Sequence, residues 1–123
     1  MEHKIYNKSR IDFHKKLKNL MDNYAFDIYE ITKKFPKDEI YGLTSQLRRA
    51  GLSIVLNYIE GYARRRKLVY KNFLEISYGS LKETKYLIYF SFKQKYLGKE
   101  EYQKFNQISE EIGAMLWGIL RRM

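Results

Sequence analysis

One stretch of the chain, residues 41–66, constrains the fold more than any other. Its apolar residues recur every three or four positions and no proline interrupts it, which predicts a single long α-helix. The stretch is apolar on more than one face and leads into four cations, Arg64, Arg65, Arg66 and Lys67. A surface helix of a small protein needs only one buried stripe. A second stripe therefore indicates a second partner, and the cations indicate an anionic ligand.

Two faces of this helix are apolar when its residues are placed at intervals of about 100°. The predicted core face consists of Leu43, Leu47, Ala50, Ile54, Tyr58 and Gly61. The second face consists of Leu52, Val55, Ile59 and Tyr62. Because one four-helix core cannot bury both faces, we interpret the second face as a contact between subunits. The alternative is that the first helix or the N-terminal arm covers it within one chain.

The rest of the chain is also helical in pattern. No segment shows the strict alternation of a strand, and no Asn-Gly or Asp-Gly pair marks a hairpin. Pro36 indicates a break between helices, and Gly98 is a candidate for the residue that follows a helix end. Short connections between four helices predict an all-α, antiparallel up-down four-helix bundle.

The predicted helices span about residues 9–35, 38–65, 68–97 and 100–122. They form one domain, residues 1–123, which begins with a flexible arm at residues 1–8. The turn between the second and third helices can lie anywhere from Gly61 to Lys67, because no strong helix breaker follows Gly61.

The chain carries a formal net charge of +10, which favours anionic partners. Nucleic acid comes first among these, and an acidic membrane or protein second. The alternative is ordinary solvated lysines that keep the protein soluble. Residues 99–123 contain four Lys/Arg and four Asp/Glu. We therefore place the basic surface in the first three quarters of the chain and expect the last quarter to be a structural closure.

Cations alternate with tyrosines on one face of the third predicted helix. These residues are Lys71, Tyr78, Lys82, Lys85, Tyr89, Lys93 and Tyr96. Lysines neutralise phosphates, and tyrosine rings stack on bases. The alternative is a solvated lysine face whose tyrosines pack against a neighbouring subunit. The predicted nucleic-acid contacts are Arg48, Arg49, Arg64, Arg65, Arg66, Lys67, Lys71, Tyr78, Lys82, Lys85, Tyr89 and Lys93.

The sequence shows no pattern typical of a catalytic, metal or cofactor site. It contains no cysteine, no glycine-rich nucleotide loop, and no cluster with metal-ligand spacing. His14 has no visible catalytic partner. We interpret Asn57 and Glu60 as structural polar residues, with Glu60 paired to Arg64 one helical turn later. We expect a non-enzymatic protein without metal or cofactor.

No apolar run approaches the roughly 20 residues of a membrane span, and the N-terminus has no apolar signal core. The expected location is therefore the cytoplasm, without a membrane partner.

Three blocks of the chain resemble a known protein family. They are YGLTSQLRRA at residues 41–50, Asn57 with EGY at residues 60–62, and GSLKE at residues 79–83. The chain resembles the 23S rRNA intervening-sequence proteins, also called S23 ribosomal proteins, over roughly residues 17–120. The accessory variability determinant of diversity-generating retroelements belongs to the same fold group. This chain departs from the family at Val55, where proline is common, and at Ile59, where alanine is common.

The resemblance implies a four-helix bundle that assembles into a ring-like homopentamer with a basic surface and no catalytic activity. It also implies RNA or DNA as a partner. Retroelement accessory proteins of this type additionally partner a reverse transcriptase. We expect an oligomeric protein that binds RNA or DNA with little sequence preference. Two alternatives stay open: an accessory protein that docks a reverse transcriptase, and a structural ring or interaction module without nucleic-acid binding.

Overall fold

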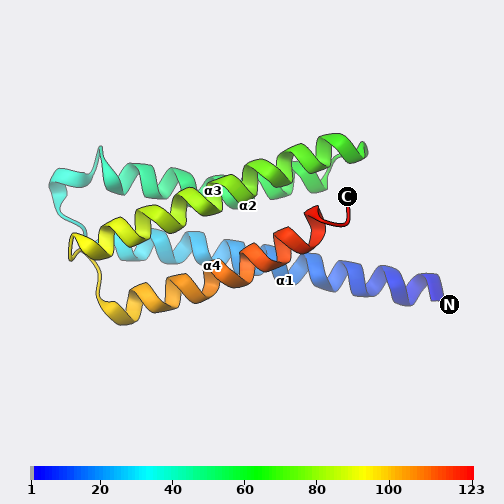
Figure 1. The fold of residues 1–123 in the computed structure, drawn as a ribbon, viewed down its shortest axis with the longest axis horizontal. Helices are drawn as coiled ribbons and strands as arrows, with labels where there is room; N and C mark the ends of the chain where they lie inside the picture. The colour runs from blue at the N-terminus through cyan, green and yellow to red at the C-terminus, as the bar shows by residue number, and fades with distance from the viewer. Residues whose placement is uncertain (1) are drawn as a thin grey trace.

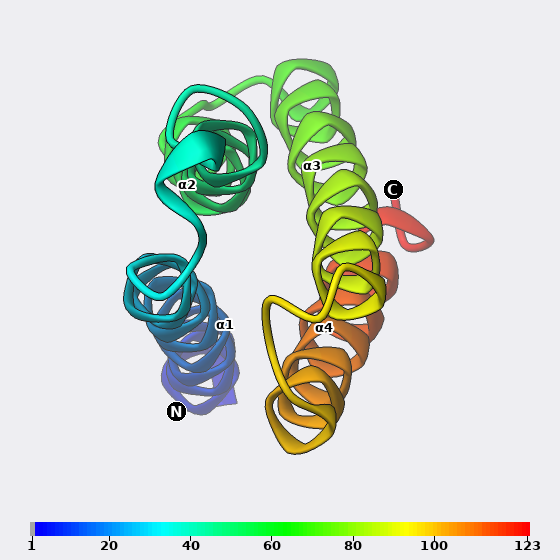
Figure 2. The same cartoon turned by 90° about the vertical axis from the view of Figure 1, so that its left-hand side faces the viewer.

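The computed structural model describes the backbone of residues 2–123 and the side chains of residues 8–123. Its helices are α1 (Glu2–Thr32), α2 (Leu43–Tyr62), α3 (Lys67–Lys93) and α4 (Lys99–Leu120), with a short 3₁₀ turn, η1 (Lys37–Glu39), before α2. The helices run up and down in turn (Figure 1). Seen from one end, they surround a common centre in chain order (Figure 2). The predicted all-α four-helix bundle is confirmed.

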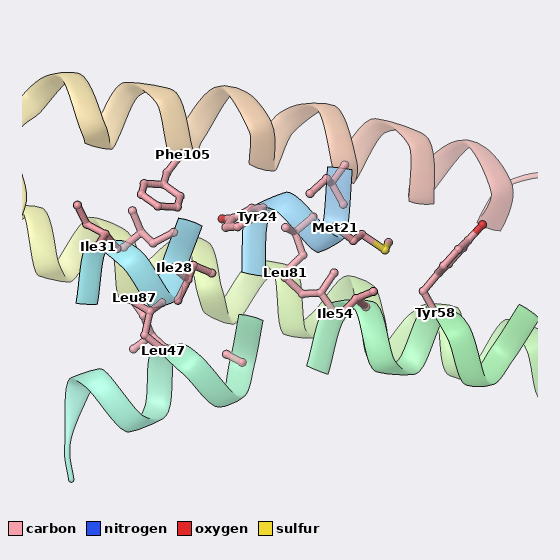
Figure 3. Close-up of a cluster of buried hydrophobic side chains, with 14 of the residues drawn as sticks. Met21, Tyr24, Ile28, Ile31, Leu47, Ile54, Tyr58, Leu81, Leu87 and Phe105 are labelled. Atoms are coloured by element: carbon pink, nitrogen blue, oxygen red, sulfur yellow. The ribbon is translucent and has the colours of Figure 1, made fainter. Parts of the chain in front are cut away.

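Apolar side chains from all four long helices meet in one core (Figure 3). The predicted core face of α2 is buried in full, from Leu43 to Gly61. Its side chains face Leu17 and Ile28 of α1 and Leu81 of α3 across a cluster that excludes water. The three- and four-residue spacing of the sequence therefore located the core correctly, because burial of a helix stripe follows directly from helix geometry.

The first connection is longer than predicted. α1 ends at Thr32, and α2 begins only at Leu43, so Asp38 lies in the 3₁₀ turn η1 rather than at the start of the second helix. Glu39 explains why α2 starts at Leu43. One of its carboxylate oxygens accepts a hydrogen bond from the Leu43 N–H at 3.3 Å, and the other accepts one from the Tyr96 hydroxyl at 3.0 Å. The Glu39 carboxylate thus satisfies an open N–H of α2 and ties this end of α2 to the α3–α4 connection.

The second connection lies within the predicted range of Gly61 to Lys67, and it is longer than the predicted helix bounds implied. α2 ends at Tyr62 rather than near Arg65, so residues 63–66 form the turn into α3. α3 packs closely on α2 just before this end. A Cβ atom at Gly61 would lie 2.7 Å from the Cβ of Phe73 and 3.3 Å from the backbone oxygen of Tyr70. Only glycine allows this approach, and α2 ends one residue after it.

Hydroxyl groups extend the contact between α2 and α3 along their length. The Ser77 hydroxyl donates to the backbone oxygen of Ile54 at 2.7 Å, and Ser53 and Ser80 share a hydrogen bond of 2.7 Å. The Asn57 side-chain amide donates to the backbone oxygen and to the hydroxyl of Ser53, at 2.8 and 2.9 Å. Asn57 therefore bonds within α2 and is linked to α3 only through Ser53, which bonds Ser80.

The end of α3 also differs from the prediction. α3 ends at Lys93, and Lys95 adopts a left-handed backbone with φ of 66°. The Lys95 N–H bonds to the oxygen of Phe92 and the Tyr96 N–H bonds to that of Ser91, both at 2.9 Å, which is the pattern of a Schellman motif. The lysine therefore takes the position that we predicted for Gly98. Gly98 instead precedes α4, where its N–H donates to Glu101 at 3.0 Å.

The first helix begins earlier than predicted. The backbone is helical from Glu2, whereas we expected an arm over residues 1–8 and a helix start near Ser9. Residues 2–8 contain neither glycine nor proline, so no residue in them breaks the helix. The N-terminal end of α1 extends beyond the α2–α3 turn (Figure 1).

His14, for which the sequence showed no partner, joins α1 to α2. Its Nδ1 hydrogen-bonds with the Tyr58 hydroxyl, and its ring centroid lies 4.1 Å from that of Tyr62. Burial, together with the nearby charge of Arg10, lowers the pKa of His14. The neutral ring can therefore accept a hydrogen bond from the Tyr58 hydroxyl, and this bond joins the two helices.

Alanine substitution at two glycines tests the close approach of α2 and α3. We expect Gly61→Ala to destabilise the protein by about 1–3 kcal/mol, because the added methyl group overlaps Phe73. Gly79→Ala should stabilise it by up to about 1 kcal/mol, because a Cβ there meets nothing within 4 Å and alanine favours the helix. Denaturant unfolding followed by circular dichroism measures both changes. A Gly61→Ala variant as stable as the wild type would contradict the requirement for close packing.

Candidate nucleic-acid interface

The antiparallel order of the helices concentrates positive charge at one end of the bundle. The end of α2, the start of α3 and the end of α4 lie there together (Figure 1). Residues 61–71 and 117–123 contain seven Lys/Arg and no Asp/Glu. The opposite end, residues 33–42 and 93–102, contains six Lys/Arg and four Asp/Glu. We call the first group the basic end; its cations are Arg64, Arg65, Arg66, Lys67, Lys71, Arg121 and Arg122.

The α2–α3 turn and the first residue of α3 supply four exposed cations of the basic end. Arg64 forms an ion pair with Glu60 at 2.7 Å, as the four-residue spacing predicted, and its guanidinium carbon lies 5.4 Å from the centre of the Phe73 ring. Arg65, Arg66 and Lys67 are exposed and form no ion pair with any acid of residues 8–123. These three cations are therefore available to an anionic ligand.

The last quarter of the chain belongs to this surface. We expected residues 99–123 to be a charge-balanced closure, yet Arg121 and Arg122 are exposed. They follow α4, whose C-terminal end lies at the same end of the bundle as the α2–α3 turn (Figure 1). A count of charge along the sequence missed them because it averaged these arginines with acids at the other end of the same helix. The up-down order of the helices would have identified them, because it brings the end of the fourth helix to the same end of the bundle as the turn between the second and third.

Arg48 has a structural partner rather than a free guanidinium. Its Nε donates to the Thr32 hydroxyl at 2.8 Å, its terminal nitrogen donates to the backbone oxygen of Tyr29 at 3.4 Å, and its guanidinium carbon lies 4.6 Å from the centre of the Tyr29 ring. Arg48 thus holds α2 against the last turn of α1, where a cation also opposes the negative end of the helix dipole. Its neighbour Arg49 is exposed.

The predicted stripe of lysines and tyrosines on α3 borders the α3–α4 contact, so only part of it is exposed. Lys85 forms an ion pair with Glu110 of α4. The Tyr89 ring lies 6.4 Å from that of Tyr102, and the Tyr78 ring 6.2 Å from that of Trp117.

Some of the remaining members of the stripe pack within the chain, and others are exposed. Tyr96 packs on Phe35 and donates to Glu39, whereas Lys82 and Lys93 are exposed and Lys71 is half-buried. The tyrosines that we assigned to a ligand or a neighbouring subunit therefore pack mostly within the chain.

The second apolar face of α2 differs from the prediction at Val55, which is buried in the core. Tyr62 contacts the rings of His14 and Tyr58 but is still 50% exposed. Leu52 and Ile59 are exposed. Leu56, which we did not predict, is more exposed than either, at 55%. Leu52, Leu56 and Ile59 form what we call the outer stripe of α2. Leu56 could have been found from its spacing, four residues after Leu52 and three before Ile59.

Comparison with known proteins identifies the family. Residues 14–118 match the family described as 23S rRNA-intervening sequence protein. The chain belongs to this family. It is also similar to a crystal structure from Bacteroides thetaiotaomicron, described as a protein with unknown function from the S23 ribosomal protein family. That similarity covers 89% of this chain and 98% of the other, with a TM-score of 0.82 and 24% sequence identity. No curated protein matches the chain.

The similarity to the Bacteroides protein concerns the fold, because the sequence identity is low and the function of that protein is described as unknown. Two further observations on this family member concern metal binding and membrane spans. No three His, Cys, Asp or Glu side chains in the described part of the chain lie close enough together to hold a metal ion. Among the same residues, no helix combines the length and hydropathy required to span a membrane.

The two adjacent arginines of this family member should behave differently on substitution. We expect Arg48→Gln to lower the free energy of unfolding by about 1–2 kcal/mol, because it removes two hydrogen bonds between α1 and α2. The matched variant Arg49→Gln should stay within about 0.5 kcal/mol of the wild type, because Arg49 is exposed. Thermal and denaturant unfolding measure both. Equal effects of the two substitutions would show that Arg48 has no structural role.

Proposed function

We propose that this chain is a non-enzymatic, oligomeric protein that binds RNA or DNA through its basic end with little preference for sequence. The observation that carries the proposal is the group of seven cations without an acid in residues 61–71 and 117–123. Three of these cations, Arg65, Arg66 and Lys67, project from one turn with no acidic partner in the described structure. Membership of a family described by its occurrence in 23S rRNA intervening sequences supports the same conclusion.

Charge alone accounts for the expected mode of binding. Lysine and arginine contacts to phosphates release counterions, and this supplies affinity without reading bases. The basic end presents long cationic side chains on a turn, which suits a phosphate backbone. Binding should therefore be strongly salt-dependent and similar for unrelated sequences.

Assembly is the second part of the proposal. Leu52, Leu56 and Ile59 leave an aliphatic stripe on the solvent side of α2. Burial of such side chains between subunits would be favourable by about 25 cal/mol per Å² of apolar surface. An assembly through this stripe would also place several basic ends in one particle and strengthen binding through multivalency. A ring-like pentamer and the docking of a reverse transcriptase, both implied by the resemblance, stay predictions.

Charge reversal at the turn tests the binding site. We expect the triple variant Arg65→Glu, Arg66→Glu, Lys67→Glu to weaken binding of single-stranded RNA by at least tenfold. The slope of log affinity against log salt concentration should fall in magnitude by about 2, because three phosphate contacts are lost. Fluorescence anisotropy over a salt series measures both, and two RNAs of unrelated sequence should lose affinity about equally.

A matched control separates the site from the total charge. The variant Lys37→Glu, Lys93→Glu, Lys99→Glu changes the net charge by the same amount at the opposite end of the bundle. Its binding should fall much less than that of the turn variant. Equal losses would mean that overall charge, or the α3 stripe with Lys93, directs binding. RNA binding that does not change between low and moderate salt would contradict the proposal as a whole.

Substitution in the outer stripe of α2 tests assembly. We expect the wild type to elute as an oligomer, and Leu56→Glu with Ile59→Glu to give a folded monomer, because two carboxylates in an apolar contact are costly to bury. Size exclusion with light scattering, after removal of nucleic acid, measures the mass. Ile76→Glu, at an exposed apolar position of α3, is the control and should stay oligomeric. A monomeric wild type would contradict this part of the proposal.

A further inference from the structure

A shallow groove of about 200 Å³ lies between α3 and α4, next to the basic end. Tyr78 and Lys82 of α3 and Trp117 of α4 line it. α3 and the C-terminal half of α4 run side by side in both views of the fold (Figures 1 and 2). Tyr78 and Lys82 belong to the predicted α3 stripe, whereas Trp117 is not among the residues predicted from the sequence.

Trp117 presents an unusually open aromatic surface. It is the only tryptophan of the chain and is 55% exposed, although a large aromatic side chain gains by burial. A helical side chain lies over the residues three and four positions before it, here Ala114 and Gly113. Because these residues are small, no bulky neighbour from the same turn covers the indole ring. Its centroid is 6.2 Å from that of Tyr78, with the rings tilted by 39°.

Positive charge borders this aromatic pair on both helices. Lys82 is exposed, and its ammonium lies 5.1 Å from the centre of the Tyr78 ring. On α4, Arg121 follows Trp117 by four residues, which is one turn and about 6 Å along the axis. On α3, Lys71 precedes Tyr78 by seven residues, which is two turns and about 10 Å. The nearby carboxylate of Glu110 is compensated by its ion pair with Lys85.

We propose that this groove, with Trp117 and Tyr78 at its centre, is a stacking site for an unpaired base of single-stranded nucleic acid. The inference rests on the proposed function and adds the class of ligand: a strand with exposed base faces rather than a duplex. A base stacks on the indole, Lys82 contacts an adjacent phosphate, and the strand continues towards Arg121 and the basic end. A duplex cannot bind in this way, because its bases are already stacked on each other.

Trp117 makes the proposal directly measurable, because it is the only tryptophan. Its emission, excited where tyrosine does not absorb, should be strongly quenched by single-stranded RNA and unchanged by a blunt duplex of the same sequence. Fluorescence anisotropy of labelled RNA measures total binding in the same samples. Trp117→Ala should weaken single-strand binding by roughly 5- to 150-fold, the range for loss of one stacked base, and leave duplex binding unchanged.

Two further variants control for folding and for aromaticity. Trp117→Phe should recover most of the lost affinity, because phenylalanine also stacks. Tyr86→Ala removes another exposed aromatic residue of α3, outside the groove, and should bind as the wild type does. Circular dichroism should show unchanged helix content for all three variants.

The outcomes distinguish this inference from the proposed function. RNA that binds with a steep salt dependence, but neither quenches Trp117 nor loses affinity on Trp117→Ala, would overturn the stacking site and leave the basic end intact. Equal quenching by single strand and duplex would also overturn it. An absence of any RNA binding at moderate salt would overturn both proposals.

Discussion

The close approach of α2 and α3 at Gly61 is the constraint on which the arrangement of the surface depends. With no side chain at this position, the Phe73 and Tyr70 side of α3 packs directly on the α2 backbone. Hydrogen bonds from Ser77 and Ser80 continue the contact along both helices. α2 ends at Tyr62, one residue after this contact, and the chain reverses within the next four residues. Those residues include three arginines, which a longer helix would have distributed around its circumference.

Helix packing gives some cations a partner within the bundle and leaves others available to an anionic ligand. Arg48 and Lys85 have partners on neighbouring helices, so their charges are largely used within the fold. Arg65, Arg66 and Lys67 have no such partner in the described structure, and the antiparallel topology brings Arg121 and Arg122 to the same end. A uniform net charge of +10 would suggest a diffuse attraction to anions. The distribution instead favours one end, which a phosphate backbone can follow towards the aromatic groove beside Trp117.

Family membership and structure contribute different parts of the functional argument. The match over residues 14–118 places the chain among the 23S rRNA-intervening sequence proteins, and the similar Bacteroides structure has the same bundle with no function described. Neither comparison names a ligand or a binding residue. The proposals for the basic end, the outer stripe of α2 and the groove therefore rest on the charges, burial and contacts of this chain.

The sequence by itself determined the fold class, the number of helices and the core, because apolar residues at helical spacing define which face of each helix is buried. It could not determine where the helices end, since Glu39, Gly61 and Lys95 act through contacts with residues distant in the chain or through backbone conformation. It also could not show that Val55 is buried and Leu56 exposed, or that Arg48 has a partner on α1 and Arg49 is exposed. Such neighbours have similar chemistry and differ only in the direction in which the helix presents them. Those assignments, and with them the candidate site, were decided by the tertiary structure, in which packing uses some side chains and leaves others exposed.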